Sequence, residues 1–160
     1  YMKKKPNPRL SSLTIALIIF ILDQWSKFSI LQQSELTNYK TIAVTSFFNL
    51  VLVFNRGVSF GMFAGQNQPL LLIAIAAIIL SILLAWLWRN SSLMVAIGIG
   101  FIIGGAVGNV VDRILYGAVV DFLDFHINDL HWPAFNIADS FVFIGVVVLC
   151  VYSMFFEKKN

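Results

Sequence analysis

The stretch from Pro69 to Trp88 reads PLLLIAIAAIILSILLAWLW and contains no charged residue. A helix needs about 20 apolar residues to cross the hydrocarbon core of a bilayer, and this stretch has that length. The rest of the chain has a similar character, since 59% of the 160 residues are hydrophobic and 12% are charged. Soluble domains are about half apolar and about a quarter charged. The sequence therefore predicts an integral membrane protein and excludes both an ordinary soluble domain and a disordered chain.

Three further stretches are long and apolar enough to span a membrane. Residues 93–111 are uncharged, residues 10–30 end in a polar run from Asp23 to Lys27, and residues 137–156 carry Asp139 near their start. We therefore predict one membrane domain, residues 1–160, with an all-α polytopic fold. Its four transmembrane helices are expected at about 10–30, 69–88, 93–111 and 137–156.

The orientation in the membrane follows from the lysines and arginines beside the spans. Four spans place both termini on one side, which carries Lys3, Lys4, Lys5, Arg9, Arg89, Lys158 and Lys159. The other side carries Lys27, Lys40, Arg56 and Arg113. The excess predicts cytoplasmic N and C termini and two long extracytoplasmic connections. Because topology accounts for the net charge of +3, we expect no nucleic-acid partner.

The two extracytoplasmic connections differ in composition. In the first, residues 31–68, the segment 41–54 is rich in Val, Ile, Phe and Thr, which is typical of one or two strands. Turn residues follow it at Asn55-Arg56-Gly57 and at Gly61. We expect a small sheet at the outer boundary of the membrane. The second connection, residues 116–136, contains Trp132, Pro133 and both histidines and is expected to be a loop.

The third predicted span carries a row of small residues. Ala96, Gly100, Gly104 and Gly108 recur every four positions, and Asp112 continues the row. Small side chains at helical spacing let a second helix approach closely. This row therefore predicts a tightly packed helix pair that ends in polar groups on the outer side.

The acidic residues are concentrated at the predicted outer ends of the helices. Asp112, Asp121, Asp124, Asp129 and Asp139 fall within 28 positions, and Asp23 ends the first apolar run. An ionised acid in or against a bilayer costs several kcal/mol, so such acids face a cavity or a partner. Spans one, three and four each bring an acid to the same depth, and this convergence is the main functional signal in the residues themselves.

Two neighbouring carboxylates suit one kind of chemistry in particular. They cannot both ionise readily, so they share a proton. One can then act as a base on water while the other polarises a carbonyl, which is peptide hydrolysis by an aspartic dyad. Asp121 in VVDF and Asp139 in FNIADS both follow small or apolar residues that would shield such a pair from water. This mechanism needs no metal and no cofactor.

Other chemistries have less support in the sequence. His126 and His131 lie near Asp124 and Asp129, but no HExxH spacing indicates zinc, and we expect solvated loop histidines. Neighbouring residues on a helix do not face each other, which argues against a Ser26–Lys27 dyad. We expect Lys27 to extend along the helix to the membrane interface.

Two non-enzymatic functions stay open as alternatives. A proton-coupled transporter or channel would use the acids as a relay and would need polar groups through the full thickness of the membrane. No ionisable residue lies between Pro69 and Trp88, or between Asp139 and Glu157. A purely structural membrane subunit would leave the acidic cluster unexplained.

Five motifs, in this order, give the chain a resemblance to a known family. They are DQWSK (residues 23–27), NRGVSFG (55–61), GGAVGNVVDR (104–113), VVDF (119–122) and FNIADS (135–140). The series resembles lipoprotein signal peptidase, the bacterial signal peptidase II family, over essentially the whole chain.

The resemblance implies an enzyme that removes signal peptides from prolipoproteins, cutting just before a cysteine that carries a diacylglyceryl group. It implies Asp121 and Asp139 as the catalytic pair. Eight further motif positions are candidates for substrate binding or support of the pair: Asp23, Lys27, Asn55, Gly57, Asn109, Asp112, Arg113 and Asn136. Among them we assign Asn55, Arg113 and Asn136 to positioning, and Asp23 and Asp112 to holding the helix ends together.

The resemblance also has consequences for the surroundings of the enzyme. It implies a β-cradle and a short interfacial helix on the extracytoplasmic side. It places the protein in the bacterial inner membrane with its active site facing outward. The expected partners are the lipidated substrate and membrane lipid, with no metal and no obligatory protein partner, so that we expect a monomer.

Overall fold

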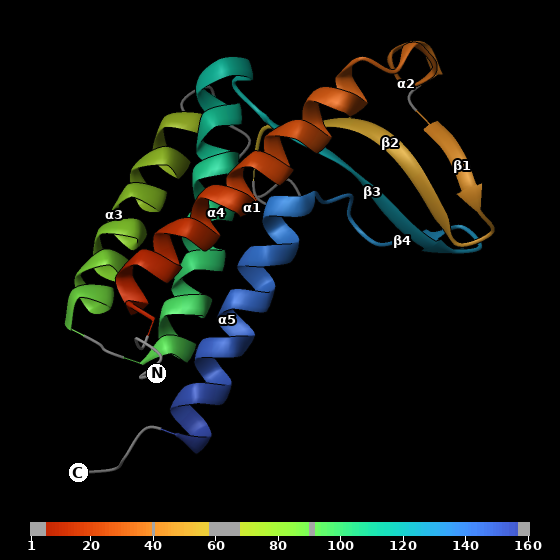
Figure 1. Cartoon of the computed structure of the whole chain (residues 1–160). Coiled ribbons are helices and arrows are strands. Elements are labelled where there is room, and N and C mark those ends of the chain that lie inside the picture. The colour runs from red at the N-terminus through yellow and green to blue at the C-terminus, as the bar shows by residue number, and fades with distance from the viewer. Residues whose placement is uncertain (1–5, 40, 58–67, 90–91, 157–160) are drawn as a thin grey trace.

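The computed structural model describes residues 6–39, 41–57, 68–89 and 92–156. Within these ranges it contains four helices long and apolar enough to cross a membrane, as predicted, together with a small antiparallel sheet. The long helices are α1 (Pro8–Leu31), α3 (Gln68–Arg89), α4 (Leu93–Tyr116) and α5 (Ile137–Phe155). The helices form a bundle, and the sheet projects sideways from one end of it (Figure 1).

Helix α4 is the centre of the bundle, because α1, α3 and α5 all pack against it. The row of small residues faces α1, as the periodicity predicts. A Cβ added at Gly104 would lie 2.6 Å from the Ala16 carbonyl oxygen, and one at Gly108 would meet the Asp23 carboxylate. On the other side of α4, a Cβ at Gly105 would meet the Ala138 carbonyl of α5. Glycine at these positions therefore lets both neighbouring helices approach the α4 backbone.

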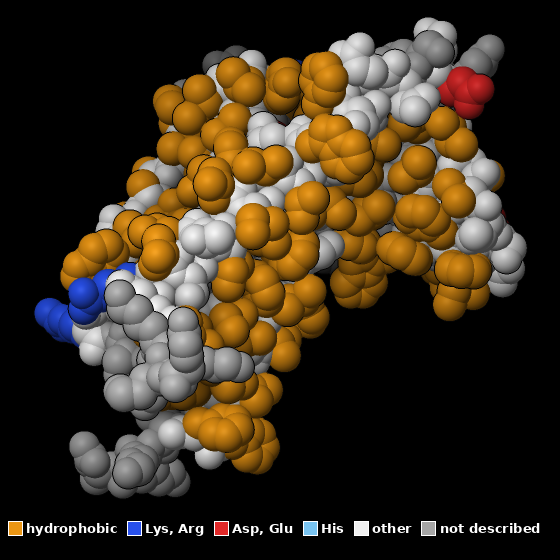
Figure 2. Space-filling model, viewed as in Figure 1, with side chains coloured by type: hydrophobic (Ala, Val, Ile, Leu, Met, Phe, Trp, Pro, Cys, Tyr) orange, Lys and Arg blue, Asp and Glu red, His pale blue; other side chains and the backbone are white. Residues whose placement is uncertain are grey.

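The apolar side chains are distributed as a membrane protein requires. Val95, Ala96 and Ile99 of α4 are fully buried between the helices. The outward faces are apolar as well, and Ile78 and Ile82 of α3 are exposed. Hydrophobic side chains cover the visible face of the bundle and continue over the sheet (Figure 2). Since hydrocarbon solvates these outer faces, the chain is a multi-pass membrane protein.

The sheet has the strand order β1-β2-β3-β4. Its elements are β1 (Thr41–Thr45), β2 (Phe48–Asn55), β3 (Val119–Ile127) and β4 (Leu130–His131), and a short helix α2 (Ser34–Tyr39) precedes β1. The prediction of strands within residues 41–54 agrees with β1 and β2. Asn49 pairs with Asp124, and Val53 pairs with Asp121, with an irregularity between these two pairs.

The expectation of a loop over residues 116–136 is wrong, because this segment contains β3 and β4. Helix α4 runs to Tyr116 rather than to about 111, and Gly117 ends it in the left-handed region at φ 65°. The chain then turns directly into β3, which lies beside β2. Asp121 and Asp124 of β3 are both buried, and each accepts a hydrogen bond from an asparagine of β2.

Candidate active site

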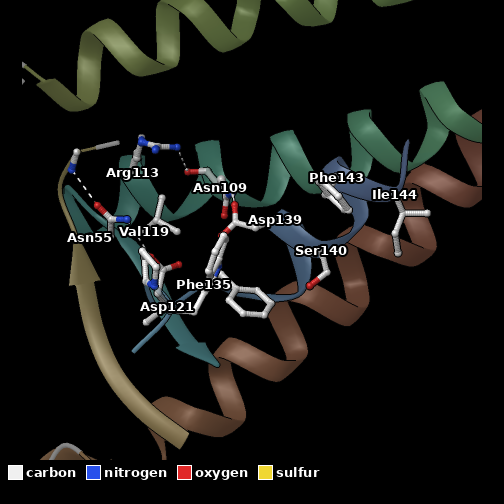
Figure 3. A pocket seen from close by; sticks show the side chains of 14 residues that line it. Asn55, Asn109, Arg113, Val119, Asp121, Phe135, Asp139, Ser140, Phe143 and Ile144 are labelled. Atoms are coloured by element: carbon white, nitrogen blue, oxygen red, sulfur yellow. Dashed lines mark hydrogen bonds between the residues drawn. The ribbon is translucent and has the colours of Figure 1, made fainter. Parts of the chain in front are cut away.

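A cleft of about 730 Å³ opens where the sheet meets α4 and α5. Asp121 and Asp139 both line it, together with the polar side chains of Asn55, Asn109 and Arg113. Figure 3 shows that these groups come from β2, β3, α4 and α5 and surround one space. Positions up to 84 residues apart in the chain thus meet at one end of the bundle, as the convergence of acids predicts.

Asp121 lies in β3 and is 2% exposed. Asn55 of β2 donates to its Oδ2 at 3.0 Å, and Asn136 donates to its Oδ1 at 2.8 Å. Burial raises the pKa of the Asp121 carboxyl, and the negative charge of Asp139 raises it further, to about 7. A carboxyl with this pKa exchanges a proton near neutral pH, which suits acid–base chemistry.

Asp139 lies in the first turn of α5, where its position is fixed by a capping box. Its backbone N–H donates to Asn136 Oδ1 at 2.9 Å, and the Asn136 N–H donates to Asp139 Oδ2 at 3.3 Å. From α4, Asn109 Nδ2 donates to Asp139 Oδ1 at 2.8 Å. Both carboxylate oxygens are therefore held by amide donors.

Asn136 joins the two aspartates. It is fully buried. Its side-chain Nδ2 donates to Asp121, and its side-chain Oδ1 accepts from the N–H of Asp139 and so caps α5. Asn136 Nδ2 also lies 3.2 Å from Asn109 Oδ1, so the two asparagines are connected as well. One buried side chain thus connects the Asp121 carboxyl to the backbone N–H of Asp139.

Behind the cleft lies a buried group of opposite charges. Lys27 Nζ is 2.7 Å from Asp23 Oδ2, 2.8 Å from Asp112 Oδ2 and 3.0 Å from Asn109 Oδ1. Lys27 is 2% exposed, so the expectation that it extends to the membrane interface is wrong. Two carboxylates and an amide oxygen compensate the ammonium group for its lost hydration, and for this reason it is stable inside the bundle.

The two carboxylates of this group also hold the backbone next to the candidate catalytic residues. Asp23 Oδ1 accepts from the N–H of Ala138 at 2.9 Å, directly before Asp139. Asp112 Oδ2 accepts from the N–H of Val120 at 3.1 Å, directly before Asp121. Asp23 thus connects α1 to the start of α5, and Asp112 connects the end of α4 to β3. Gln24, which the sequence singled out only within a motif, donates to Asp112 Oδ1 at 3.0 Å.

The remaining candidates lie around the cleft. Arg113 lines it and donates from Nη1 to the Asn109 carbonyl at 3.3 Å, while its buried Nε has no hydrogen-bond partner within the protein. Gly57 also lines the cleft, and its N–H donates to Asn55 Oδ1 at 3.1 Å. The rest of the NRGVSFG motif, with Gly61, lies outside the described residues.

Sequence reasoning missed the apolar lining of the cleft. Trp132, Pro133, Ala134 and Phe135 form one wall, and α5 contributes Phe143 and Ile144. Phe135 opens the FNIADS motif, and only the proximity of residues 132–134 to that motif could have indicated the rest of this wall.

His131 is exposed, as expected of a solvated histidine, but its Nδ1 also bonds to the buried carboxylate of Asp124. Within the described part of the chain, no three potential ligands are grouped as a metal site would require.

Comparisons with known proteins agree with this geometry. The sequence model of the family described as "Signal peptidase (SPase) II" matches residues 15–156. Lipoprotein signal peptidase of Alteromonas mediterranea is 44% identical over 89% of this chain and 79% of its own length. That of Rhodopseudomonas palustris is 44% identical over 91% and 92%. A solved bacterial membrane enzyme superimposes with a TM-score of 0.78 at 31% identity, covering 93% of each chain.

Proposed function

The chain belongs to the signal peptidase II family, and we propose on this premise that Asp121 and Asp139 are its catalytic dyad. As a member of that family it is a membrane peptidase of lipoprotein processing. The proposed reaction removes the signal peptide of a prolipoprotein by cutting just before the diacylglyceryl-modified cysteine. The observation that carries the proposal is the meeting of the buried Asp121 carboxyl and the partly buried Asp139 carboxyl at one cleft, joined by Asn136.

The pair carries one proton in the competent state. The ionised carboxylate removes a proton from a water molecule, and the resulting hydroxide attacks the scissile carbonyl. The protonated carboxyl donates to the carbonyl oxygen and stabilises the charge that develops there. A proton then passes to the leaving amine, which breaks the C–N bond and frees the signal peptide. The raised pKa of Asp121 supports this scheme, since it keeps one proton on the pair near neutral pH.

Amide groups keep both carboxyls in place through this cycle. Asn55, Asn109 and Asn136 donate to them without neutralising their charge. The free Nε of Arg113 is available to a carbonyl of the substrate backbone. These residues would therefore position substrate and dyad rather than exchange protons themselves.

The cleft suits a substrate that arrives from the bilayer. Its polar end holds the dyad, and Phe143 and Ile144 of α5 continue it along an exposed apolar face. A signal peptide is an apolar helix, and a diacylglyceryl chain prefers hydrocarbon, so both would enter sideways between lipid and α5. The remaining parts of the proposal are a monomer in the bacterial inner membrane, with cytoplasmic termini and an outward-facing site cradled by the sheet.

The test is cleavage of a diacylglyceryl-modified prolipoprotein by purified protein in detergent. Asp121→Asn and Asp139→Asn should each lower kcat by about 10⁴-fold, because neither variant can share a proton across the pair. Thermal unfolding of both variants should stay cooperative. Asp129→Asn is the matched control, since this aspartate is exposed in the turn between β3 and β4. Normal processing by either dyad variant would exclude that residue from catalysis.

A relay function for the same acids would show a different result. In that case proteoliposomes would carry a proton or solute flux that Asp121→Asn abolishes, whether or not the lipoprotein is cleaved. The described acids of α1, α4, β3 and α5 gather at one end of the bundle, which is unfavourable for a relay.

A further inference from the structure

One wall of the cleft consists of a segment without regular structure. Residues 132–135 follow directly after β4, and all four line the cleft. At the far end of this segment, Phe135 pairs with the backbone of Leu123, with N···O distances of 2.8 and 3.1 Å. At the near end, the N–H of Trp132 donates to the Phe125 carbonyl at 2.8 Å. The wall therefore depends on how firmly β4 is attached to β3.

Strand β4 is only two residues long, so its backbone pairing is a weak attachment by itself. A side-chain contact reinforces it. His131 Nδ1 lies 2.8 and 2.9 Å from the two carboxylate oxygens of Asp124 on β3. Behind this pair, Asn49 of β2 donates from Nδ2 to Asp124 Oδ2 at 2.9 Å. Three strands are thus connected through one carboxylate, immediately before the wall begins.

The Asp124 carboxylate is well placed to act as the fixed point of this cluster. It is 5% exposed, whereas about half of the His131 side chain is accessible. Burial raises the pKa of the Asp124 carboxyl, but the hydrogen bonds from His131 and Asn49 outweigh it and bring that pKa below the ordinary value. The carboxylate is therefore ionised at neutral pH, and a hydrogen bond to a charged group is stronger than one between neutral groups.

We propose that His131 and Asp124, with Asn49 behind them, are positioning residues that clip the cleft wall formed by residues 132–135 to the sheet. None of the three belongs to the dyad or to its supporting amides. They act through the wall, by setting where Trp132 and the following residues meet the substrate. The inference rests on the proposed peptidase function only in naming that substrate, because the clip itself is a contact within the sheet.

The experiment compares three variants of the full-length protein in detergent micelles. His131→Ala removes the donor to Asp124, and we expect KM for the lipidated substrate to rise about tenfold with kcat changed less than about twofold. His131→Asn retains a donor near the position of Nδ1 and should recover most of the affinity. His126→Ala is the matched control, because His126 faces His131 across the hairpin, with ring centroids 4.8 Å apart, and is not hydrogen-bonded to Asp124.

Hydrogen exchange supplies a readout that does not depend on catalysis. In His131→Ala the amides of Trp132, Ala134 and Phe135 should exchange about tenfold faster, while those of α4 keep their rates; Pro133 has no amide hydrogen. If the wild-type protein failed to cleave the substrate, the proposed function would be wrong, but the exchange rates would still show whether His131 holds the cleft wall against the sheet. Unchanged exchange rates in the wall, or an equal loss of kcat in all three variants, would contradict the positioning role of His131.

Discussion

Two groups of carboxylates, buried or partly buried, lie at this end of the bundle, and they differ in their partners. Asp23 and Asp112 share the ammonium group of Lys27 at 2.7 and 2.8 Å. Asp121 and Asp139 are held by asparagine amides, and in the described part of the chain neither forms an ion pair with a lysine or arginine. In the first group a lysine ammonium lies between the two carboxylates and offsets part of their charge, which stabilises the fold. The second group has no such cation, and the pKa of Asp121, raised to about 7 by burial and by the charge of Asp139, suits proton exchange near neutral pH.

Contacts between the two groups of carboxylates explain why the groups lie side by side. Lys27 contacts Asn109, and Asn109 donates to Asp139. Asp23 and Asp112 hold the backbone N–H groups of Ala138 and Val120, the residues before the two candidate catalytic aspartates. The ion-paired group therefore supports the backbone on which the candidate catalytic pair is positioned.

The largest expected effect comes from removing the shared cation. Lys27→Met leaves two buried carboxylates without compensation and should lower the free energy of unfolding by about 3–5 kcal/mol. Denaturant or thermal unfolding in detergent measures this loss. Adding Asp112→Asn to Lys27→Met should recover part of it, since one uncompensated charge is removed. A Lys27→Met protein as stable as the wild type would mean that the ion pairs do not support the bundle.

The pH dependence of stability should come from the other group. The pKa of Asp121 is raised from 3.8 to about 7 in the folded state, so its contribution to stability is fully present below about pH 4 and is lost as the pH rises through about 7. Between pH 5 and pH 9 the loss is about 3 kcal/mol. The free energy of unfolding of Asp121→Asn should decrease less over the same pH range. If the free energies of unfolding of the two proteins changed in parallel with pH, the raised pKa of Asp121 would be contradicted.

Removing one amide donor should have the smallest effect of the three. Asn55→Ala takes away the 3.0 Å hydrogen bond to Asp121 Oδ2 and leaves the bond from Asn136 in place. We expect kcat to fall about tenfold, because the carboxyl keeps its pairing but loses part of its fixed orientation. Steady-state kinetics with the lipidated substrate measure this, with the neighbouring exposed Arg56→Gln as control. A wild-type kcat in Asn55→Ala would remove Asn55 from the site.

The sequence predicted the parts of the molecule that depend on composition and periodicity. The four apolar helices follow from run length, and the close approach of α1 to α4 follows from the four-residue spacing of Gly100, Gly104 and Gly108. The acids at the ends of the spans indicated where the cleft would be. Each of these signals is local in the chain, and membrane burial makes it strong.

The errors concern residues whose environment is set by distant parts of the chain. Lys27 was expected at the interface because nothing nearby in sequence showed that Asp112 of α4 would compensate its charge. Strand β3 was missed because nothing nearby in the sequence showed that Asn49 and Asn55 of β2 would bond to its aspartates. The bond from the exposed His131 to Asp124 was missed as well, because the two residues are brought together by the pairing of β3 with β4. Polar residues buried through long-range pairing are not distinguishable by pattern from exposed ones.

The central claim is that Asp121 and Asp139 act together on one water molecule and one carbonyl group. A crystal structure with a lipopeptide analogue that carries a hydroxyl in place of the scissile carbonyl tests it most directly. The account predicts the hydroxyl oxygen at about 2.6–3.2 Å from a carboxylate oxygen of each aspartate. An analogue that inhibits the enzyme but places its hydroxyl more than about 8 Å from either carboxylate would contradict the dyad, since one water could not then join both groups.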